Sequence, residues 1–428
     1  MKKKIIIIGG GLTGILISKF LNKEKFDVTL VESSKNLGGY LSSIKHNKYN
    51  FDFGTHFLRE TGKKDIDKIL FNKIRLKWHK FKVIPSGCYY NNNLINSNQF
   101  IDLRYNKKYQ KILNEILNNK RLKFNFRSEL ERCLYDFGNT ITKDIIEPII
   151  FKYCNLKLKN IKPYTIDKFA LARYVLASNE NTISLKKKNR FYDKVIAYNS
   201  FNNGNAGLYN FYPKNGGIEK FKNFFLDKNI KIIKGQKIVK IDFLKNRIRN
   251  LVLDNKKISA DYIFSTVPLH KISVKKKDKE IKRKNSFIDW GTTNILSNKK
   301  FKTDCYYINI HDPKTNAYRI TFYDNIQDTK TKKKYRATIE FVGYKNKKVS
   351  NKIINDLLFK TKLIDRDFKI EVLSFFKTKL PFGIEKNKFK NVSNLKIINN
   401  SLFNGISQED NIVKIYNSIK IFNEKNYN

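Results

Sequence analysis

Apolar and polar residues at the N-terminus alternate in blocks that predict a strand, a tight turn, a helix and a second strand. Ile5–Ile8 form an uninterrupted apolar run, which is typical of a buried strand. The glycine-rich segment Gly9–Gly14 follows directly, and Ile15–Leu21 is compatible with a helix. A second apolar run, Val28–Val31, predicts a strand that ends at Glu32.

This order of elements is the one that holds the adenosine half of a dinucleotide. Gly9 permits the tight turn, Gly11 lets the backbone approach a pyrophosphate, and Gly14 lets the helix pack closely on the strand. The helix N-terminus offers unpaired N–H groups and a partial positive charge to phosphate groups. Glu32 follows Gly14 by 18 residues and lies where an acid meets the ribose hydroxyls.

The N-terminus also has one feature of a signal peptide, because Lys2–Lys4 precede an apolar run. The glycines interrupt that run, Lys19 enters it, and no small-residue cleavage site follows before Asn22–Lys25. We therefore expect a folded dinucleotide-binding unit. No segment has about twenty uninterrupted apolar residues, so we expect no transmembrane helix and leave peripheral membrane contact open.

Hydrophobic periodicity predicts helices earlier in the chain and strands later. Helices are expected over Asp65–Lys73, Tyr109–Leu117 and Ser128–Phe137, where Ser128 and Glu131 have the spacing of a capping box. Strands are expected over Cys305–Ile310, Tyr318–Tyr323, Arg336–Val342 and Ile370–Phe376. The Asn-rich stretches Tyr89–Asn98 and Asn199–Asn205 are typical of loops.

Composition sets the class of protein. A chain of 428 residues is long enough for two or more domains, and 41% hydrophobic residues argue against disorder. The net charge of +49 would favour a nucleic-acid partner if the lysines were clustered. They are dispersed along the whole chain, so we interpret the charge as compositional bias and expect no specific nucleic acid. A basic chain would still attract an anionic small molecule.

Cysteine and histidine spacing gives no sign of a disulfide framework or of a metal site. The four cysteines lie far apart without a CxxC pair, and the five histidines have no ligand spacing. This use of cysteine indicates a reducing compartment, and we expect a cytoplasmic protein without a bound metal. The oligomeric state is left open.

The residues after Glu32 resemble a known family. The pair Gly38–Gly39 and the run Asn50–His56 are similar to the "GG" and "D.G.H" segments of the glutathione-reductase-type FAD superfamily. Within it, the chain resembles the branch that holds amine oxidases, protoporphyrinogen oxidases, carotenoid desaturases and UDP-galactopyranose mutases. Further stretches match this branch in order, namely Phe137–Gly138, Glu147–Asn155, Phe211–Ile218, Lys237–Ile241, Ala260–Pro268, and His311–Arg319 together with Glu340.

The resemblance implies an α/β fold in which a discontinuous Rossmann-type FAD domain carries two insertions. The FAD domain is expected over 1–60, 212–272 and 388–428, with a mostly helical insertion at 61–211 and a β-rich substrate domain at 273–387. The residues implied to bind FAD are Gly9, Gly11, Leu12, Thr13, Gly14, Glu32, Ser33, Gly38, Gly39, Tyr40, Gly54, Val239, Asp410, Asn411 and Ile412.

Four residues are candidates for the substrate side. His56 falls where the family places a residue against the flavin, so it is the catalytic candidate, although a lone histidine is usually structural. Arg319 lies in an otherwise uncharged strand, where a charge requires a reason such as an anionic substrate or a partner like Glu340. Arg59 would face an anionic substrate or pyrophosphate, or would be a solvated surface charge.

One segment departs from the family. The relatives usually carry a Gly-Asp or Gly-Arg pair after a late strand, close to the ribityl chain, but here Leu395–Ile398 is followed by Asn399–Asn400. The family's helix start is retained at Ser407–Ile412, where the helix N-terminus would face the pyrimidine edge of the flavin. The departure indicates weaker cofactor packing or a change in activity.

Three functions remain open at this stage. The first is an FAD-dependent oxidoreductase of the amine-oxidase type, which passes a hydride from a small organic substrate to flavin. The second is a mutase-like flavoenzyme acting on a nucleotide sugar for cell-surface polysaccharide synthesis, with Arg319 and Arg173 binding the diphosphate. The third is a flavin-binding protein without catalytic activity.

Overall fold

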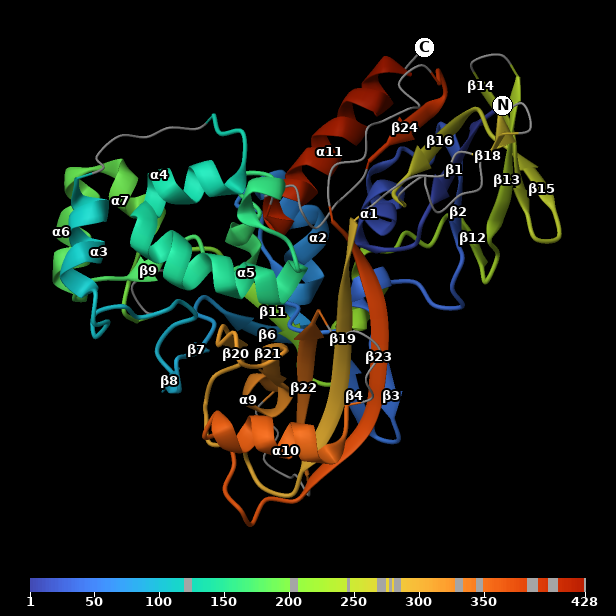
Figure 1. Cartoon of the computed structure of the whole chain (residues 1–428). Coiled ribbons are helices and arrows are strands. Elements are labelled where there is room, and N and C mark those ends of the chain that lie inside the picture. Colours follow the sequence, from blue (N-terminus) through green and yellow to red (C-terminus); the bar gives the residue numbers. More distant parts are fainter. Residues whose placement is uncertain are drawn as a thin grey trace.

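The computed structural model describes residues 1–118, 125–200, 207–244, 247–267, 275–276, 279–280, 286–327, 334–343, 349–382, 392–398 and 407–426. Figure 1 shows a parallel sheet beside the N-terminus, a helical lobe on the opposite side, and a large, mostly antiparallel sheet below both. The fold class expected from the sequence, α/β with a Rossmann-type domain and added helical and β-rich parts, is confirmed.

The parallel sheet has the strand order β12–β2–β1–β16–β24. Its strands are β12 (Lys231–Lys234), β2 (Phe26–Glu32), β1 (Lys3–Ile8), β16 (Tyr262–Ser265) and β24 (Leu395–Ile397). Because β1 and β2 are parallel and adjacent, Glu32 at the end of β2 lies beside the turn that follows β1. The expected strand, turn, helix and strand are all present, and the helix is α1 (Leu12–Phe20).

Alternation along β1 explains how this sheet is covered on both faces. Ile5 and Ile7 point into a core shared with α1 and α11 (Gln408–Lys425). Ile6 and Ile8 point the other way, into a core shared with a three-stranded antiparallel sheet. That sheet consists of β13 (Ile238–Leu244), β14 (Arg247–Leu253) and β15 (Lys257–Ser259).

The large sheet has the order β23–β19–β22–β21–β20–β7–β8. Its strands are β23 (Ile370–Phe382), β19 (Ser286–Ser297), β22 (Tyr335–Val342), β21 (Ala317–Phe322), β20 (Tyr307–Ile310), β7 (Ser86–Tyr90) and β8 (Asn93–Ile95). All four strands expected in the later part of the chain belong to it, whereas β19 was not anticipated. Helix α10 (Asn351–Lys360) packs against it, and α9 (Tyr323–Gln327) follows β21.

The expectation of a loop at Tyr89–Asn98 is wrong. Strands β7 and β8 form a hairpin in this stretch, and Asn91 and Asn92 make the turn with φ values of 50° and 59°. Asparagine tolerates the left-handed conformation that a tight hairpin turn requires. The hairpin also brings a part of the chain that was expected to be mostly helical into the β-rich sheet. The second Asn-rich stretch, Asn199–Asn205, lies mostly outside the described residues.

The helices expected at 65–73, 109–117 and 128–137 are present. The described helices between residues 64 and 195 are α2 (Lys64–Lys77), α3 (Tyr109–Leu117), α4 (Glu129–Ile141), α5 (Glu147–Cys154), α6 (Asn179–Lys188) and α7 (Arg190–Val195), with a π-helix at Thr142–Ile146. Ser128 caps α4 by accepting a hydrogen bond from the N–H of Glu131. The Glu131 carboxylate accepts a hydrogen bond from the N–H of Arg127 at 2.8 Å.

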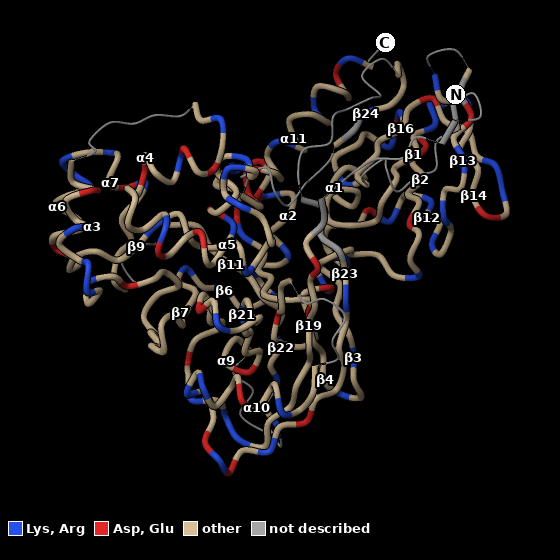
Figure 2. The backbone as a smooth tube through the Cα atoms, viewed as in Figure 1, with Lys and Arg blue, Asp and Glu red and all other residues tan. Residues whose placement is uncertain are grey.

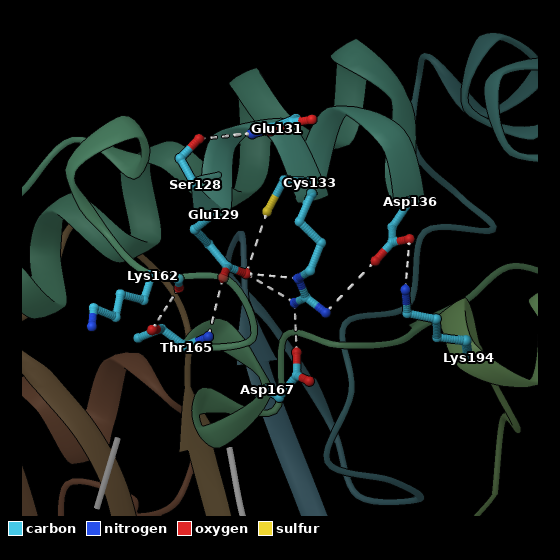
Figure 3. A network of polar contacts seen from close by, with 10 residues as sticks. Ser128, Glu129, Glu131, Cys133, Asp136, Lys162, Thr165, Asp167 and Lys194 are labelled. Atoms are coloured by element: carbon cyan, nitrogen blue, oxygen red, sulfur yellow. Dashed lines mark hydrogen bonds and ion pairs between the residues drawn. The ribbon is translucent and has the colours of Figure 1, made fainter. Parts of the chain in front are cut away.

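Helix α4 buries an arginine among three carboxylates. Arg132 is 1% exposed, and its guanidinium lies 2.9 Å from Glu129 Oε1, 2.5 Å from Asp167 Oδ1 and 3.6 Å from Asp136 Oδ2. Lys194 Nζ approaches Asp136 Oδ1 from the far side at 2.9 Å. Figure 3 shows Glu129 and Asp136 descending from the helix, with Asp167 rising from the segment below. The network ties α4 to two other segments of the lobe.

Short strands connect these parts. Strands β3 (Ser43–His46) and β4 (Tyr49–Asp52) form a hairpin that leads from the parallel sheet toward the large one. A second small sheet has the order β5–β11–β6, from β5 (Leu58–Arg59), β11 (Asn210–Pro213) and β6 (Trp78–Phe81). The exact limits of the domains stay a prediction.

Positive charge is spread over every part of the fold. Figure 2 shows Lys and Arg along the helical lobe, the large sheet and the parallel-sheet domain alike. Within the described residues, no helix combines the length and apolar character needed to cross a bilayer. In the same part of the chain, His, Cys, Asp and Glu do not gather in threes that would hold a metal ion.

Candidate functional site

The glycine turn between β1 and α1 is tightly packed on one side and open on the other. Gly9 has a φ of 102°, and a Cβ placed on Gly14 would lie 1.9 Å from the carbonyl oxygen of Gly9. A Cβ on Gly11 would meet only Gly39 Cα, at 4.0 Å. Gly14 is thus required for packing. Gly11 instead faces open space, where a ligand has room to contact the protein backbone.

The start of α1 and the end of β2 provide the groups that a dinucleotide requires. Helix α1 begins at Leu12 without a side-chain cap, and the partial positive charge of its N-terminus favours an anion there. Glu32 Oε2 accepts from the N–H of Gly10 at 2.7 Å, and Oε1 accepts from Ser34 N at 2.8 Å and Ser33 Oγ at 3.2 Å. These bonds fix the carboxylate beside the turn.

The second glycine pair lies against the first turn. The N–H of Gly38 donates to Gly10 O at 2.8 Å, and a Cβ on Gly39 would lie 3.2 Å from Gly11 Cα. The two glycines have φ values of 124° and 57°, which favour glycine. Tyr40 follows them, half exposed, and burial raises the pKa of its hydroxyl, while a hydrogen bond from Thr378 of β23 lowers it.

The adenine side of the expected site is less enclosed. The N–H groups of Gly235 and Gln236 donate to the carbonyls of Ser34 and Glu32, so the chain enters β13 beside the ribose acid. Val239 follows in β13 and is 45% exposed. Its predicted contact is therefore available to a ligand at the surface.

A second group of candidate residues gathers where the segment after β4 meets the large sheet. We call Thr55, His56, Arg319, Thr321 and Glu340 the His56–Arg319 site. Arg319 of β21 and Glu340 of β22 are register partners, and Arg319 donates from Nε to Oε1 at 2.6 Å and from Nη2 to Oε2 at 3.2 Å.

The segment Gly54–His56 lies directly on this ion pair. A Cβ on Gly54 would lie 2.7 Å from Glu340 Oε2, so only glycine fits there. The φ of Gly54, 131°, also favours glycine. The N–H of Thr55 donates to Glu340 Oε1 at 3.3 Å, and its hydroxyl lies 2.5 Å from that of Thr321. The predicted residues Gly54, His56, Arg319 and Glu340 are therefore brought together.

His56 is neutral in this setting. Burial and the positive charge of Arg319 lower its pKa from 6.5 to about 3. Its Nε2 atom is buried and has no hydrogen-bond partner among the described residues. A buried nitrogen without a partner is costly unless a ligand supplies one, which supports a binding role over a structural one.

Arg59 has a partner of its own. Its Nη1 atom donates to Glu409 Oε1 at 3.1 Å, in the first turn of α11. Asp410 there accepts a hydrogen bond from Ser407 and Ile412 is buried, while Asn411 follows Asp410 in the same turn. Two acidic residues in this turn reduce the positive potential that the helix N-terminus would offer to a flavin edge. Asn399–Asn400 lie outside the described residues.

Asp52 and the tyrosines beside Arg319 are contributors that the sequence did not identify. The Asp52 carboxylate accepts from Ser43 Oγ and Tyr212 OH, both at 2.6 Å, and burial raises its pKa to about 6. The guanidinium carbon of Arg319 lies 5.8 Å and 5.1 Å from the ring centroids of Tyr307 and Tyr318. The feature of the sequence that could have identified Asp52 is an acidic residue placed between two phenylalanines, Phe51 and Phe53.

Comparison with known proteins agrees with this geometry. Residues 7–70 match the family described as NAD(P)-binding Rossmann-like domain. The chain is 24% identical over 297 residues to a 4,4'-diaponeurosporene oxygenase of Staphylococcus haemolyticus (strain JCSC1435), covering 62% of this chain. The match spans about half of that relative's length, 55%.

Solved structures extend the likeness to the whole chain. A reduced UDP-galactopyranose mutase superposes with a TM-score of 0.71 and 14% identity, covering 100% of this chain and 95% of the other. A protein described as a putative protoporphyrinogen oxidase from Exiguobacterium sp. 255-15 gives a TM-score of 0.65 and 13% identity, covering 99% of each chain. At these identities the likeness establishes the fold.

Proposed function

We propose that this chain, which has the fold of the FAD-dependent amine oxidase-like superfamily, is an FAD-dependent oxidoreductase acting on a small organic substrate. The observation that carries the proposal is the course of the segment 38–56. It begins at Gly38–Gly39 against the glycine turn and ends at Gly54–His56 against Arg319 and Glu340. One continuous segment therefore joins a dinucleotide-type turn to a polar site on the sheet.

The residues of the first cluster fit the adenosine half and the pyrophosphate of FAD. The open side of Gly11, the uncapped start of α1 and the Glu32 carboxylate supply the space, the N–H donors and the acceptor that this half requires. When bound, FAD supplies the acceptor for a hydride. The protein's part is to orient the substrate and exclude water.

His56 serves this chemistry as an uncharged hydrogen-bonding group. A pKa of about 3 leaves it a poor base at neutral pH, so we assign it to binding and orienting a polar atom. The Thr55–Thr321 and Thr55–Glu340 contacts hold its segment in place. Arg59 is assigned to fixing α11 through Glu409 rather than to substrate.

A nucleotide-sugar mutase is the second candidate, favoured by the likeness to the reduced mutase over the whole chain. Its diphosphate would require free cations, but Arg319 is held by Glu340. Arg173 donates to the carbonyl of Asp193 near α7. Because of these contacts we rank the mutase as the second candidate, after the oxidoreductase. A catalytically inactive flavin protein had its support in Asn399–Asn400, which the structure does not describe.

Anaerobic reduction of the bound flavin tests the proposal. Amines, porphyrinogens and polyenes are mixed with the FAD-loaded protein, and the loss of flavin absorbance is followed. We expect one of these classes to bleach the flavin, because hydride transfer reduces it. If none does, and UDP-galactopyranose is converted only after prior reduction of the flavin, the mutase is the correct assignment.

A further inference from the structure

We propose that the His56–Arg319 site recognises an uncharged polar group, a carbonyl or hydroxyl oxygen on an otherwise apolar substrate, and excludes phosphates and carboxylates. This inference rests on the proposed function, since it names the substrate class of the same site. It argues against the anionic substrate that the net charge of the chain suggests.

The first reason is that Glu340 already neutralises Arg319. The carboxylate takes two donors from the guanidinium and a third from the N–H of Thr55. Glu340 is 1% exposed, and its Oε2 atom lies close enough to Gly54 that a Cβ there would be 2.7 Å away, so the carboxylate is closely packed. An incoming phosphate or carboxylate would have to displace a buried, bidentate partner of Arg319 or lie beside an uncompensated like charge.

The second reason is the character of the donors that remain. Arg319 keeps 20% of its side chain exposed, and within the described residues its Nη1 atom makes no hydrogen bond. Nε2 of His56 is likewise without a partner there. A hydroxyl group pairs with either atom, and a carbonyl oxygen accepts from Nη1 or from a protonated Nε2, in both cases without adding charge. A site with unpaired polar atoms selects ligands that pair them.

The third reason is the aromatic packing around the pair. Beyond Arg319, Tyr318 is 4% exposed and packs edge-on against Trp290 with ring centroids 4.8 Å apart, so that side is closed core. Toward β23, the partly exposed rings of Phe376 and Phe53 pack together at 5.7 Å. The polar corner is therefore bordered by these two rings, which suit an apolar substrate body.

Matched probes test the charge preference directly. Benzamide and benzoate have the same shape and differ in charge, and UDP represents a diphosphate. Their affinities for the full-length protein are measured by saturation-transfer NMR, and flavin content is read separately from the absorption spectrum. We expect benzamide to bind at least tenfold more tightly than benzoate, and UDP to bind no better than benzoate.

Glu340→Gln should reverse this ranking, with benzoate gaining at least tenfold, because Arg319 then lacks its counter-charge. Glu371→Gln is the control, since Glu371 lies in β23 of the same sheet and pairs with Lys334 at the exposed surface; it should change nothing. If Glu340→Gln does not fold, the wild-type ranking decides alone. Tighter binding of benzoate or UDP, or no binding of benzamide, overturns the inference.

The two proposals fail separately in this experiment. A protein that holds flavin but prefers UDP keeps the oxidoreductase fold assignment and loses the neutral-substrate inference. A protein without flavin that still prefers benzamide keeps the inference about the site and loses the proposed function.

Discussion

Asp52 joins segments that are far apart in the sequence through one buried carboxylate. It accepts from Ser43 Oγ and Tyr212 OH at 2.6 Å and from Ile218 N at 3.0 Å, while its own N–H donates to Tyr323 OH at 2.9 Å. The sequence places Asp52 in a family motif, yet its role could not be predicted because most of its partners lie more than 150 residues away. The close contact between Glu340 and Gly54 could not be predicted for the same reason, because the two residues are far apart in the sequence.

Asp52 gives a pH dependence with a defined sign. Burial raises its pKa from 3.8 to about 6. Between these two pH values the folded state therefore keeps a proton that the unfolded state has already lost. Its contribution to the free energy of unfolding is present below about pH 4 and decreases by about 3 kcal/mol as the pH rises through 6.

Urea unfolding of wild type and Asp52→Asn at about pH 4 and pH 7 measures this change. The stability of the wild type relative to the variant should fall by about 2 kcal/mol between the two conditions, because the asparagine does not titrate and most of the effect of Asp52 lies between them. A stability difference between the two proteins that stays constant with pH, or that grows in favour of the wild type as the pH rises, would contradict the raised pKa.

At the scale of elements, the sequence predicts most helices and strands but not β19 or the β7–β8 hairpin. The unit from β1 to β2 is encoded in consecutive residues, so apolar runs and glycines were sufficient to predict it. Strand β19 was missed because Ser286–Ser297 mixes polar and apolar residues, and its strand form depends on pairing with β22 and β23. The β7–β8 hairpin was missed because asparagine was taken as a sign of a loop.

Helix α4 depends on its buried arginine. Arg132→Met leaves Glu129 buried without its counter-charge and leaves Asp136 with Lys194 alone, so we expect a loss of about 3–5 kcal/mol in the free energy of unfolding. Chemical denaturation measures it. Lys108→Met is the matched control, because Lys108 pairs with Asp144 where both side chains are largely exposed, and it should change stability by at most about 0.5 kcal/mol. Equal stability of the two variants would show that the network is not required.

At the scale of the whole molecule, the segment 38–56 connects two sites built from distant parts of the chain. The parallel sheet supplies the glycine turn and Glu32, and the large sheet supplies Arg319 and Glu340. Family resemblance anticipated this arrangement, because the motifs appear in the right order along the chain. It left open whether Arg319 pairs with Glu340 or binds an anionic substrate, and the register of β21 against β22 closes the pair.

The central claim is that the chain binds FAD through the glycine turn. The most direct measurement is the visible absorption spectrum of the protein after gel filtration, for wild type and Gly11→Ala. We predict flavin bands that elute with the wild type and are lost in the variant. The flavin-free forms of the two proteins should share one thermal midpoint, because a Cβ at Gly11 meets no protein atom closer than 4.0 Å. A wild type that stays colourless and takes up no added FAD, or a variant that holds flavin as tightly as the wild type, would contradict the account.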